Sequence, residues 1–256
     1  MIHKTAIVDA STTIAADVTI GAYSVIGANV SIGAGTVIGS HVSIKGTTTI
    51  GENNHIYQFA SVGEDPQDKK YAGELSYLEI GDNNIIREFT TIHRGTIQDK
   101  NITLIGNDNL LMAYTHVAHD CVIANDVILA NAASLGGHVR IGSSVILGGF
   151  SIVHQFCQVG DYSFSAMGSA IAKDVPPYVM VGGRPTQPHG INIVGLERKG
   201  FSKGSILEIK RAYKLLYKSG LKLTEAVDQL EVKARDISEL QRMVTFLKGS
   251  NRSILR

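Results

Sequence analysis

Residues 105–147 read IGNDNL-LMAYTH-VAHDCV-IANDVI-LANAAS-LGGHVR-IGSSVI-L when they are divided into sixes. Each six begins with Ile, Leu or Val, and with two breaks the same spacing extends back to Ile2 and forward to Ile171. Over the whole series 25 of 26 positions are aliphatic, and Ser165 is the exception. A period of six does not match the 3.6 residues of a helical turn, but it is even, so the repeated residue can face one side of every short strand. The stretch therefore predicts short strands that alternate with bends.

Two further positions of the repeat support this interpretation. The residue two before each aliphatic one is mostly small or apolar, which places it inward as well, and the residue after the aliphatic one is often glycine, which we interpret as the site of a tight bend. Three sixes make one 18-residue coil of a parallel β-helix. Cys121 and Cys157 are then two coils, or roughly 10 Å, apart. We expect no disulfide between them.

Composition and charge exclude several classes of protein. The 24 basic and 23 acidic residues give a net charge of +1, which does not suit a general nucleic-acid binder. Two cysteines in 256 residues exclude a disulfide scaffold. No apolar run reaches the roughly 18 residues of a membrane helix, and the first residues lack the apolar stretch of a signal peptide. We therefore expect a cytoplasmic protein without membrane insertion.

The repeats end near Pro185, which predicts a β-helix domain over residues 1–185 and a helical domain over residues 186–256. Residues 64–79 and 94–104 break the period, and we expect both to be loops that leave the coil, where functional residues tend to concentrate. In the second domain we predict a helix from Ser202 to Gly220, a second capped by Thr224 with Val227, Leu230 and Val232 as apolar positions, and a third over 237–247.

The 18-residue coil also converts sequence distance into position. His119, Gly137 and Gln155 are 18 apart and should stack on the outer surface, with Asp120, His138 and Phe156 as the next stack. A neutral imidazole can accept a hydroxyl proton near pH 7, and a glycine amide can stabilise an oxyanion. Asp120 could orient a neighbouring imidazole. These stacks are suited to acyl transfer.

The histidines allow two other interpretations. His116, His119 and His138 could supply three imidazoles to a metal ion, but their spacing differs from that of metal-binding β-helix enzymes, so we expect no metal. The second alternative is a non-catalytic β-helix that serves as a structural or binding platform.

Several strings are more specific than the bare repeat: IYQFASVGE (56–64), YAGE (71–74), TIHRGT (91–96), HVAHDC (116–121), GGHV (136–139), VHQFC (153–157), DVPPY (174–178) and RAYK (211–214). With them the chain resembles the UDP-N-acetylglucosamine O-acyltransferases of lipid A biosynthesis, a family of hexapeptide-repeat acyltransferases, over essentially its full length. The resemblance implies a left-handed coil and a homotrimer with active sites between neighbouring prisms. It also implies transfer of a 3-hydroxyacyl group from acyl carrier protein to the 3-hydroxyl of UDP-N-acetylglucosamine, without a further cofactor.

The resemblance also assigns site residues. His119 matches the family's general base, Asp120 its supporting carboxylate and Gly137 the oxyanion donor. The remaining matches are substrate-binding positions, namely Asp68, Lys70, His116, His138, His154, Gln155, Asn192 and Arg198. The same chemistry on a 3-amino sugar nucleotide remains open, because a histidine base serves both acceptors.

Three features of the sequence qualify this assignment. Val194 and Lys199 stand where the family commonly has Glu and Arg, which puts the nucleotide contacts of this segment in doubt. Met167 matches the position that measures the acyl chain, and its bulk predicts a donor of about ten carbons, since overfilling a closed groove is costly. Residues 196–222 carry a net charge of +6, which suits an acidic carrier protein.

Overall fold

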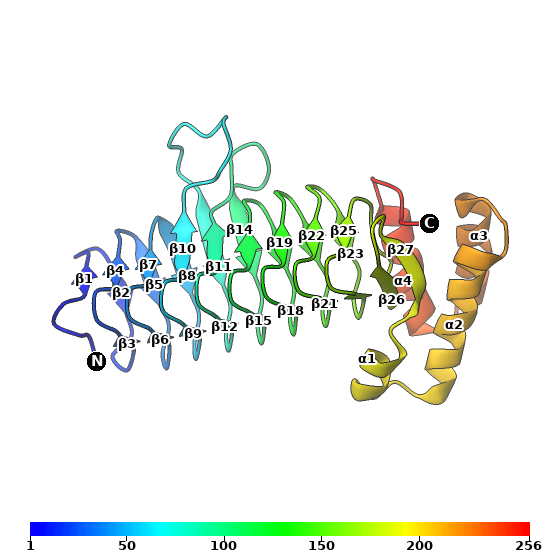
Figure 1. Cartoon of the computed structure of the whole chain (residues 1–256), viewed down its shortest axis with the longest axis horizontal. Helices are drawn as coiled ribbons and strands as arrows, with labels where there is room; N and C mark the ends of the chain where they lie inside the picture. Colours follow the sequence, from blue (N-terminus) through cyan, green and yellow to red (C-terminus); the bar gives the residue numbers. More distant parts are fainter.

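The computed structural model describes all 256 residues, and its main body is a left-handed parallel β-helix with three flat faces (Figure 1). The first face contains β1 (Ile7–Val8), β4 (Val25–Ile26), β7 (Ser43–Ile44), β10 (Ser61–Glu64), β13 (Thr91–His93), β16 (His116–Val117), β19 (Ser134–Leu135), β22 (Ile152–Val153) and β25 (Ala170–Ile171). The second contains β2 (Thr13–Ile14), β5 (Val30–Ile32), β8 (Thr47–Ile50), β11 (Tyr77–Ile80), β14 (Ile102–Ile105), β17 (Val122–Ile123), β20 (Arg140–Ile141) and β23 (Gln158–Val159). The third contains β3 (Thr19–Ile20), β6 (Val37–Ile38), β9 (His55–Ile56), β12 (Ile85–Ile86), β15 (Leu110–Leu111), β18 (Ile128–Leu129), β21 (Ile146–Leu147), β24 (Phe164–Ser165), β26 (Val179–Gly182) and β27 (Gln187–Ile191).

The register confirms the six-residue period. Each coil strand pairs in parallel with the strand one coil further on, for example Val117 with Leu135 and Leu135 with Val153. The repeated aliphatic residues fill the interior, and from Ile20 onward nearly all of them are fully buried. The position two before them is buried too, as predicted. Cys121 and Cys157 occupy this position as free thiols.

The interpretation of the glycines as bend residues was wrong for most of them. The corners are formed three residues after the aliphatic position, where residues such as Asp120, His138 and Phe156 have φ near +60°. The glycine directly after the aliphatic residue serves close packing between coils, because a Cβ on Gly21 or Gly33 would lie 2.6–2.7 Å from the backbone of the next coil.

Two loops leave the coil on the same side, as Figure 1 shows. They are shorter than the predicted ranges 64–79 and 94–104, because β11 already begins at Tyr77 and β14 at Ile102. Leu78 and Thr103 are fully buried in the coil, which the polar composition around them concealed. The loops therefore span 65–76 and 94–101.

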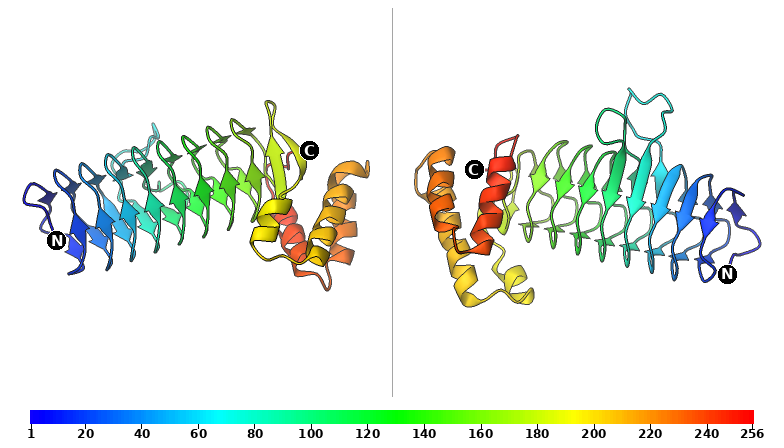
Figure 2. Two further views of the ribbon diagram at one scale, coloured as in Figure 1. Left: turned by 60° about the horizontal axis from the view of Figure 1, so that its bottom comes forward. Right: turned by 180° about the vertical axis from the view of Figure 1, so that it is seen from behind.

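The helical region follows the last coil and covers one end of the prism (Figure 2). It contains α1 (Ile193–Arg198), α2 (Lys203–Lys218), α3 (Leu223–Lys233) and α4 (Ser238–Gly249). The boundary predicted at 185 cuts through a hairpin, because β26 and β27 pair antiparallel across it and extend the third face. The chain end also returns to the prism, where Ile254 bridges to Asp174.

Two details of the helices differ from the prediction. Ser202 caps α2 as expected, since its side chain accepts a hydrogen bond from the Ser205 amide at 3.0 Å. However, α3 begins two residues earlier than predicted, and the Lys222 amide donates to Glu225 at 2.9 Å while Thr224 lies inside the helix. Val232 was expected on the apolar face and is exposed. No helix in the chain has the length and apolar content needed to span a membrane.

Candidate active site

A cleft of about 800 Å3 lies where the two loops overhang the coil. The 65–76 loop contributes four polar side chains, the 94–101 loop two, and the coil the remainder. Its lining comprises Gln67, Asp68, Lys69, Lys70, Gln98, Asp99, His119, His138, Gln155 and Phe156. Five of the predicted site residues, namely Asp68, Lys70, His119, His138 and Gln155, therefore lie together in one chain.

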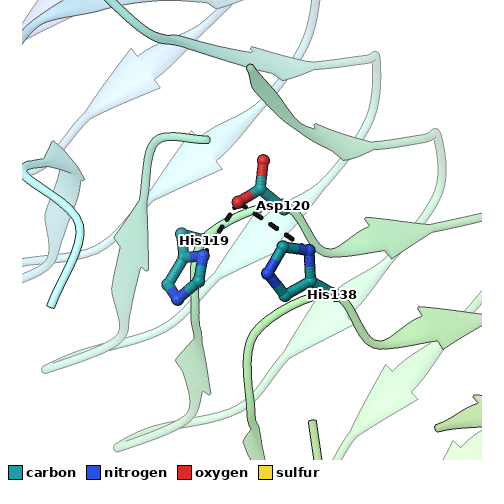
Figure 3. Close-up of side chains that lie close together, drawn as sticks. All are labelled: His119, Asp120 and His138. Carbon is teal, nitrogen blue, oxygen red and sulfur yellow. Dashed lines mark hydrogen bonds and ion pairs between the residues drawn. The ribbon is translucent and has the colours of Figure 1, made fainter. Parts of the chain in front are cut away.

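His119 and Asp120 form a hydrogen-bonded pair at the edge of this cleft (Figure 3). The His119 Nδ1 atom lies 2.8 Å from Asp120 Oδ2, and the Asp120 side chain is fully buried. The Thr96 amide and hydroxyl donate to Asp120 at 2.9 and 2.6 Å. Burial raises the pKa of the Asp120 carboxyl, but the hydrogen bonds from His119 and Thr96 outweigh burial and hold this pKa below its ordinary value. An ionised Asp120 accepts a hydrogen bond from the Nδ1–H group of His119, which leaves the lone pair of Nε2 free to accept a proton from a substrate.

Gly137 lies directly against the His119 ring, as the 18-residue spacing predicts. A Cβ on Gly137 would lie 2.7 Å from both Cε1 and Nε2 of His119, so only glycine leaves this space open. The Gly137 carbonyl accepts from the Phe156 amide, whereas its own amide has no hydrogen-bond partner in the structure. A donor that is unpaired beside a candidate base can serve an oxyanion.

His138 lies at the same corner of the coil as Asp120, one coil further on. Its Nδ1 lies 2.9 Å from Asp99 Oδ2, and its ring stacks on Phe156 with 4.3 Å between centroids. One possible ligand atom from each of His119, Asp120 and His138 lies within 4.8 Å of the other two, so Asp120 takes the place that His116 had in the metal alternative. The hydrogen bonds to Thr96 and Asp99 already account for how these groups are held. The absence of a metal remains a prediction.

His116 lies in β16, three residues before His119 in the same coil, with its Nδ1 2.7 Å from Thr91 Oγ1 on the neighbouring coil. Burial and the neighbouring His119 lower the pKa of His116. The His93 ring meets the His116 ring edge-on at 5.0 Å and is 4% exposed. Burial, followed by the proximity of His116, lowers the pKa of His93 to about 4.

Buried His93 makes stability depend on pH. Its pKa in the folded state, about 4, is below the 6.5 of a solvated histidine, so between these values the unfolded chain binds a proton that the folded chain does not. We expect His93 to cost about 1–3 kcal/mol of unfolding free energy as the pH falls from 6.5 to 4. His93→Gln, which does not titrate, should lose correspondingly less over this range in urea unfolding. Equal losses in both proteins would contradict the assignment.

Apart from Asp120, Gly137 and His116, which adjoin His119, four predicted site residues lie outside the lining of the cleft in this chain. Asn192 caps α1, and with Val194 and Arg198 it lines a separate pocket of about 390 Å3 on the third face. His154 is exposed, with Arg252 Nη1 3.0 Å from its Nδ1, and Met167 is 78% exposed. Lys199, the second departure from the family pattern, forms an ion pair with Asp126.

The residues that hold the site together were not among those predicted from the sequence. Thr96 and Asp99 lie in a loop without periodicity, so the coil arithmetic could not place them. His93 ends β13 and Arg94 follows it, and both are buried, at 4% and 7% exposure. The adjacent string His93-Arg94 within a polar loop was the available signal, because charged residues are seldom buried without a specific partner.

Comparison with known proteins identifies the family of the chain. The model of the second domain of UDP N-acetylglucosamine O-acyltransferase matches residues 174–255, and the bacterial transferase hexapeptide model matches 102–137. The acyl-[acyl-carrier-protein]–UDP-N-acetylglucosamine O-acyltransferase of Thiobacillus denitrificans is 52% identical over 255 residues, which cover 100% of this chain and 99% of the relative.

Two solved structures are similarly close. LpxA from Acinetobacter baumannii has a TM-score of 0.98 at 52% identity, with 100% of this chain and 99% of that chain covered. UDP-N-acetylglucosamine acyltransferase from Francisella novicida has a TM-score of 0.99 at 44% identity, with 100% and 94% covered. With the repeat, the helical end and the sequence all matching over the full length, the chain belongs to the UDP-N-acetylglucosamine O-acyltransferase family.

Proposed function

We propose that this protein transfers a 3-hydroxyacyl group from acyl carrier protein to the 3-hydroxyl of UDP-N-acetylglucosamine, the first step of lipid A biosynthesis, in the cytoplasm. Family membership supports the reaction class. The observation that carries the mechanism is the pair of His119 and buried Asp120 beside the unpaired Gly137 amide. The carrier thioester is the donor, so the reaction requires no further cofactor.

The pair is suited to a base-catalysed acyl transfer. His119 Nε2 removes the proton of the sugar hydroxyl while its oxygen attacks the thioester carbonyl, and the Gly137 amide donates to the oxyanion that forms. The C–S bond then breaks, and His119 returns its proton to the departing thiolate. Asp120 stabilises the positive charge that the imidazole carries between these two steps.

The cleft residues supply the contacts to the acceptor. Lys70 offers an ammonium group to the diphosphate, and Asp68, His138 and Gln155 offer groups that can hydrogen-bond sugar hydroxyls. We propose that His154, Asn192 and Arg198 complete the site from neighbouring copies in a homotrimer. Val194 and Lys199 then weaken the nucleotide contacts near α1, since Val194 has no acceptor and Lys199 lacks the planar fork of arginine.

A ridge of stacked aromatic rings supports the assembly. Tyr23, His41, Phe59, Phe89 and Tyr114 stack along the corner between the third and first faces, with successive centroids 4.9–5.3 Å apart. The four Phe and Tyr residues are 43–61% exposed, and a contiguous apolar surface of this kind is typical of an interface. Met167 precedes a residue of this same corner, so a copy packed along the ridge would also enclose Met167.

Placing a charge on the ridge should separate the copies. We expect Phe89→Glu to convert the trimer to monomers in size-exclusion chromatography with light scattering, because a carboxylate cannot be buried there unpaired. Val232→Glu on α3, which alters an apolar residue that is even more exposed than Phe89 and lies far from the ridge, should remain trimeric. A trimeric Phe89→Glu protein would remove the ridge from the interface.

A competition reaction tests the proposed activity directly. Pure protein is incubated with UDP-N-acetylglucosamine, its 3-amino analogue and 3-hydroxyacyl carrier proteins of about ten to fourteen carbons. We expect mass spectrometry to find the ester of UDP-N-acetylglucosamine. An amide of the analogue as the main product would favour the amino acceptor, and no product would favour a non-catalytic platform.

Carrier protein binding should depend on salt. The basic residues of 196–222 include Lys203, Lys210, Lys214 and Lys218 on α2, and their field attracts an acidic partner. Raising the ionic strength from about 0.05 to 0.3 M shortens the range of this attraction. We expect the KM for acyl carrier protein to rise severalfold while kcat changes little. A salt-independent KM would mean that this surface is merely solvated.

A further inference from the structure

Arg94 is a buried cation at the base of the 65–76 loop. Its side chain is 8% exposed, whereas the side chain of Asp65, its ion-pair partner, is 61% exposed. Buried ion pairs contribute little net stability, because desolvation offsets the attraction. Net stability therefore does not explain why a cation is buried at this position, one residue after β13.

The contacts of the guanidinium extend over the whole loop. Its Nη1 donates to the Gly63 carbonyl and its Nη2 pairs with Asp65, both where the loop leaves the coil. Its Nη2 also donates to the Tyr71 hydroxyl at 3.0 Å in the middle of the loop, and its Nε to Ser76 Oγ at 3.4 Å where the loop returns. One side chain thus joins both ends of the loop to its centre.

The coil provides a fitted space for this side chain. Gly46 has a φ of +63°, and a Cβ there would collide with the guanidinium of Arg94. The Arg94 amide donates to the Glu64 carbonyl at 3.1 Å, which fixes its backbone against the start of the same loop.

The contact with Tyr71 leads directly to the cleft. The Tyr71 amide donates to the Asp68 carbonyl at 3.0 Å, and the Lys70 amide donates to Asp68 Oδ1 at 3.0 Å. Residues 68–71 therefore form one turn that is anchored at Tyr71 and presents Asp68 and Lys70 to the cleft.

We propose that Arg94 is a positioning residue for the acceptor: its guanidinium holds the 65–76 loop in the conformation that presents Asp68 and Lys70 to the sugar nucleotide. The assignment rests on the proposed function for the identity of that acceptor. Arg94 lies outside the cleft lining, so it acts through the loop and not by contact with the substrate.

Arg94→Lys tests this role, because lysine retains the charge but lacks the fork that reaches Gly63, Asp65, Tyr71 and Ser76 together. We expect the KM for UDP-N-acetylglucosamine to rise by about tenfold, with kcat and the KM for acyl carrier protein within about threefold of wild type. Tyr71→Phe removes one of the contacts and should show a smaller change of the same kind. Arg87→Lys, at the exposed ion pair of Arg87 with Glu88, is the matched control and should leave every value unchanged.

Trypsin gives a readout that needs no substrate. Lys69 and Lys70 are adjacent cleavage sites within the loop, and cleavage there should be at least severalfold faster in Arg94→Lys than in wild type or Arg87→Lys. Unchanged cleavage, or a fall in kcat together with the melting temperature but no selective rise in the acceptor KM, would overturn the positioning role. Because trypsin reports on the loop alone, a wild-type protein that is inactive on UDP-N-acetylglucosamine would count against the proposed function only.

Discussion

His119→Ala should lower kcat by about three orders of magnitude while the KM values change little, the range expected for the loss of a positioned general base. The imidazole lies against Gly137 with a free ring nitrogen, and it is hydrogen-bonded to the fully buried Asp120 at 2.8 Å, whereas His138 lies 4.0 Å from Asp120 and bonds Asp99 instead. Residual activity would come from the Gly137 amide and from substrate binding, which the substitution leaves in place. Single-turnover assays with saturating substrates measure the chemical step directly.

Two further variants separate the base from a structural effect. Asp120→Asn should also lower kcat strongly, because an amide that donates to Nδ1 would move the ring proton to Nε2 and block proton removal. His55→Ala, at an exposed coil histidine stacked on Tyr57, should behave like wild type. Full acyl transfer by His119→Ala would overturn the assignment of the base.

Met167→Gly should change the preferred acyl chain from ten carbons to fourteen. Met167 lies one coil beyond Gly149, on the corner that we propose a neighbouring copy encloses, so its side chain would close the acyl groove. Burying four more methylenes is worth about 3 kcal/mol, so the ratio of kcat/KM for the two donors should shift on the order of 100-fold.

A substitution that narrows the groove should shift the preferred acyl chain length in the opposite direction. A Cβ on Gly149 would meet a single neighbour, the Asn131 carbonyl at 3.3 Å, which has to shift by a few tenths of an ångström to accept it. Gly149→Met therefore places the same bulk one coil closer to His119 and should exclude even the ten-carbon donor. An unchanged preference in Met167→Gly would show that Met167 does not limit the chain.

The parts of the molecule that obey the period could be predicted from the sequence. The coil, its inward positions and the contact of His119 with Gly137 follow from counting in sixes and eighteens, since parallel neighbours are always one coil apart. The hydrogen bonds of Asp120 to Thr96 and of His138 to Asp99 could not be found this way, because both partners come from a loop that follows no period.

The helical end was less predictable for a different reason. The helix over 193–198 is too short for an amphipathic pattern, and β27 joins the third face antiparallel although its residues include Pro188 and Gly190. The strand conformation of β27 is determined by its pairing with β26, and not by the local preferences of its residues. The predicted start of α3 was wrong because the N-cap residue is Lys222 and not Thr224. The Glu225 carboxylate accepts the hydrogen bond of the Lys222 amide, and the Thr224 hydroxyl caps nothing.

The left-handed corners have a consequence for how this surface can change. Every sixth residue from Tyr114 to Tyr162 has φ between +57° and +65°, although none of the nine is glycine or asparagine. Each such corner costs of the order of 1 kcal/mol, so the stacked coils must enforce the geometry whatever side chain is present. The aromatic ridge and the row with Asp120 and His138 are therefore the same backbone carrying different chemistry. A new reaction on such a prism requires substitutions along one corner row and leaves the aliphatic interior as it was.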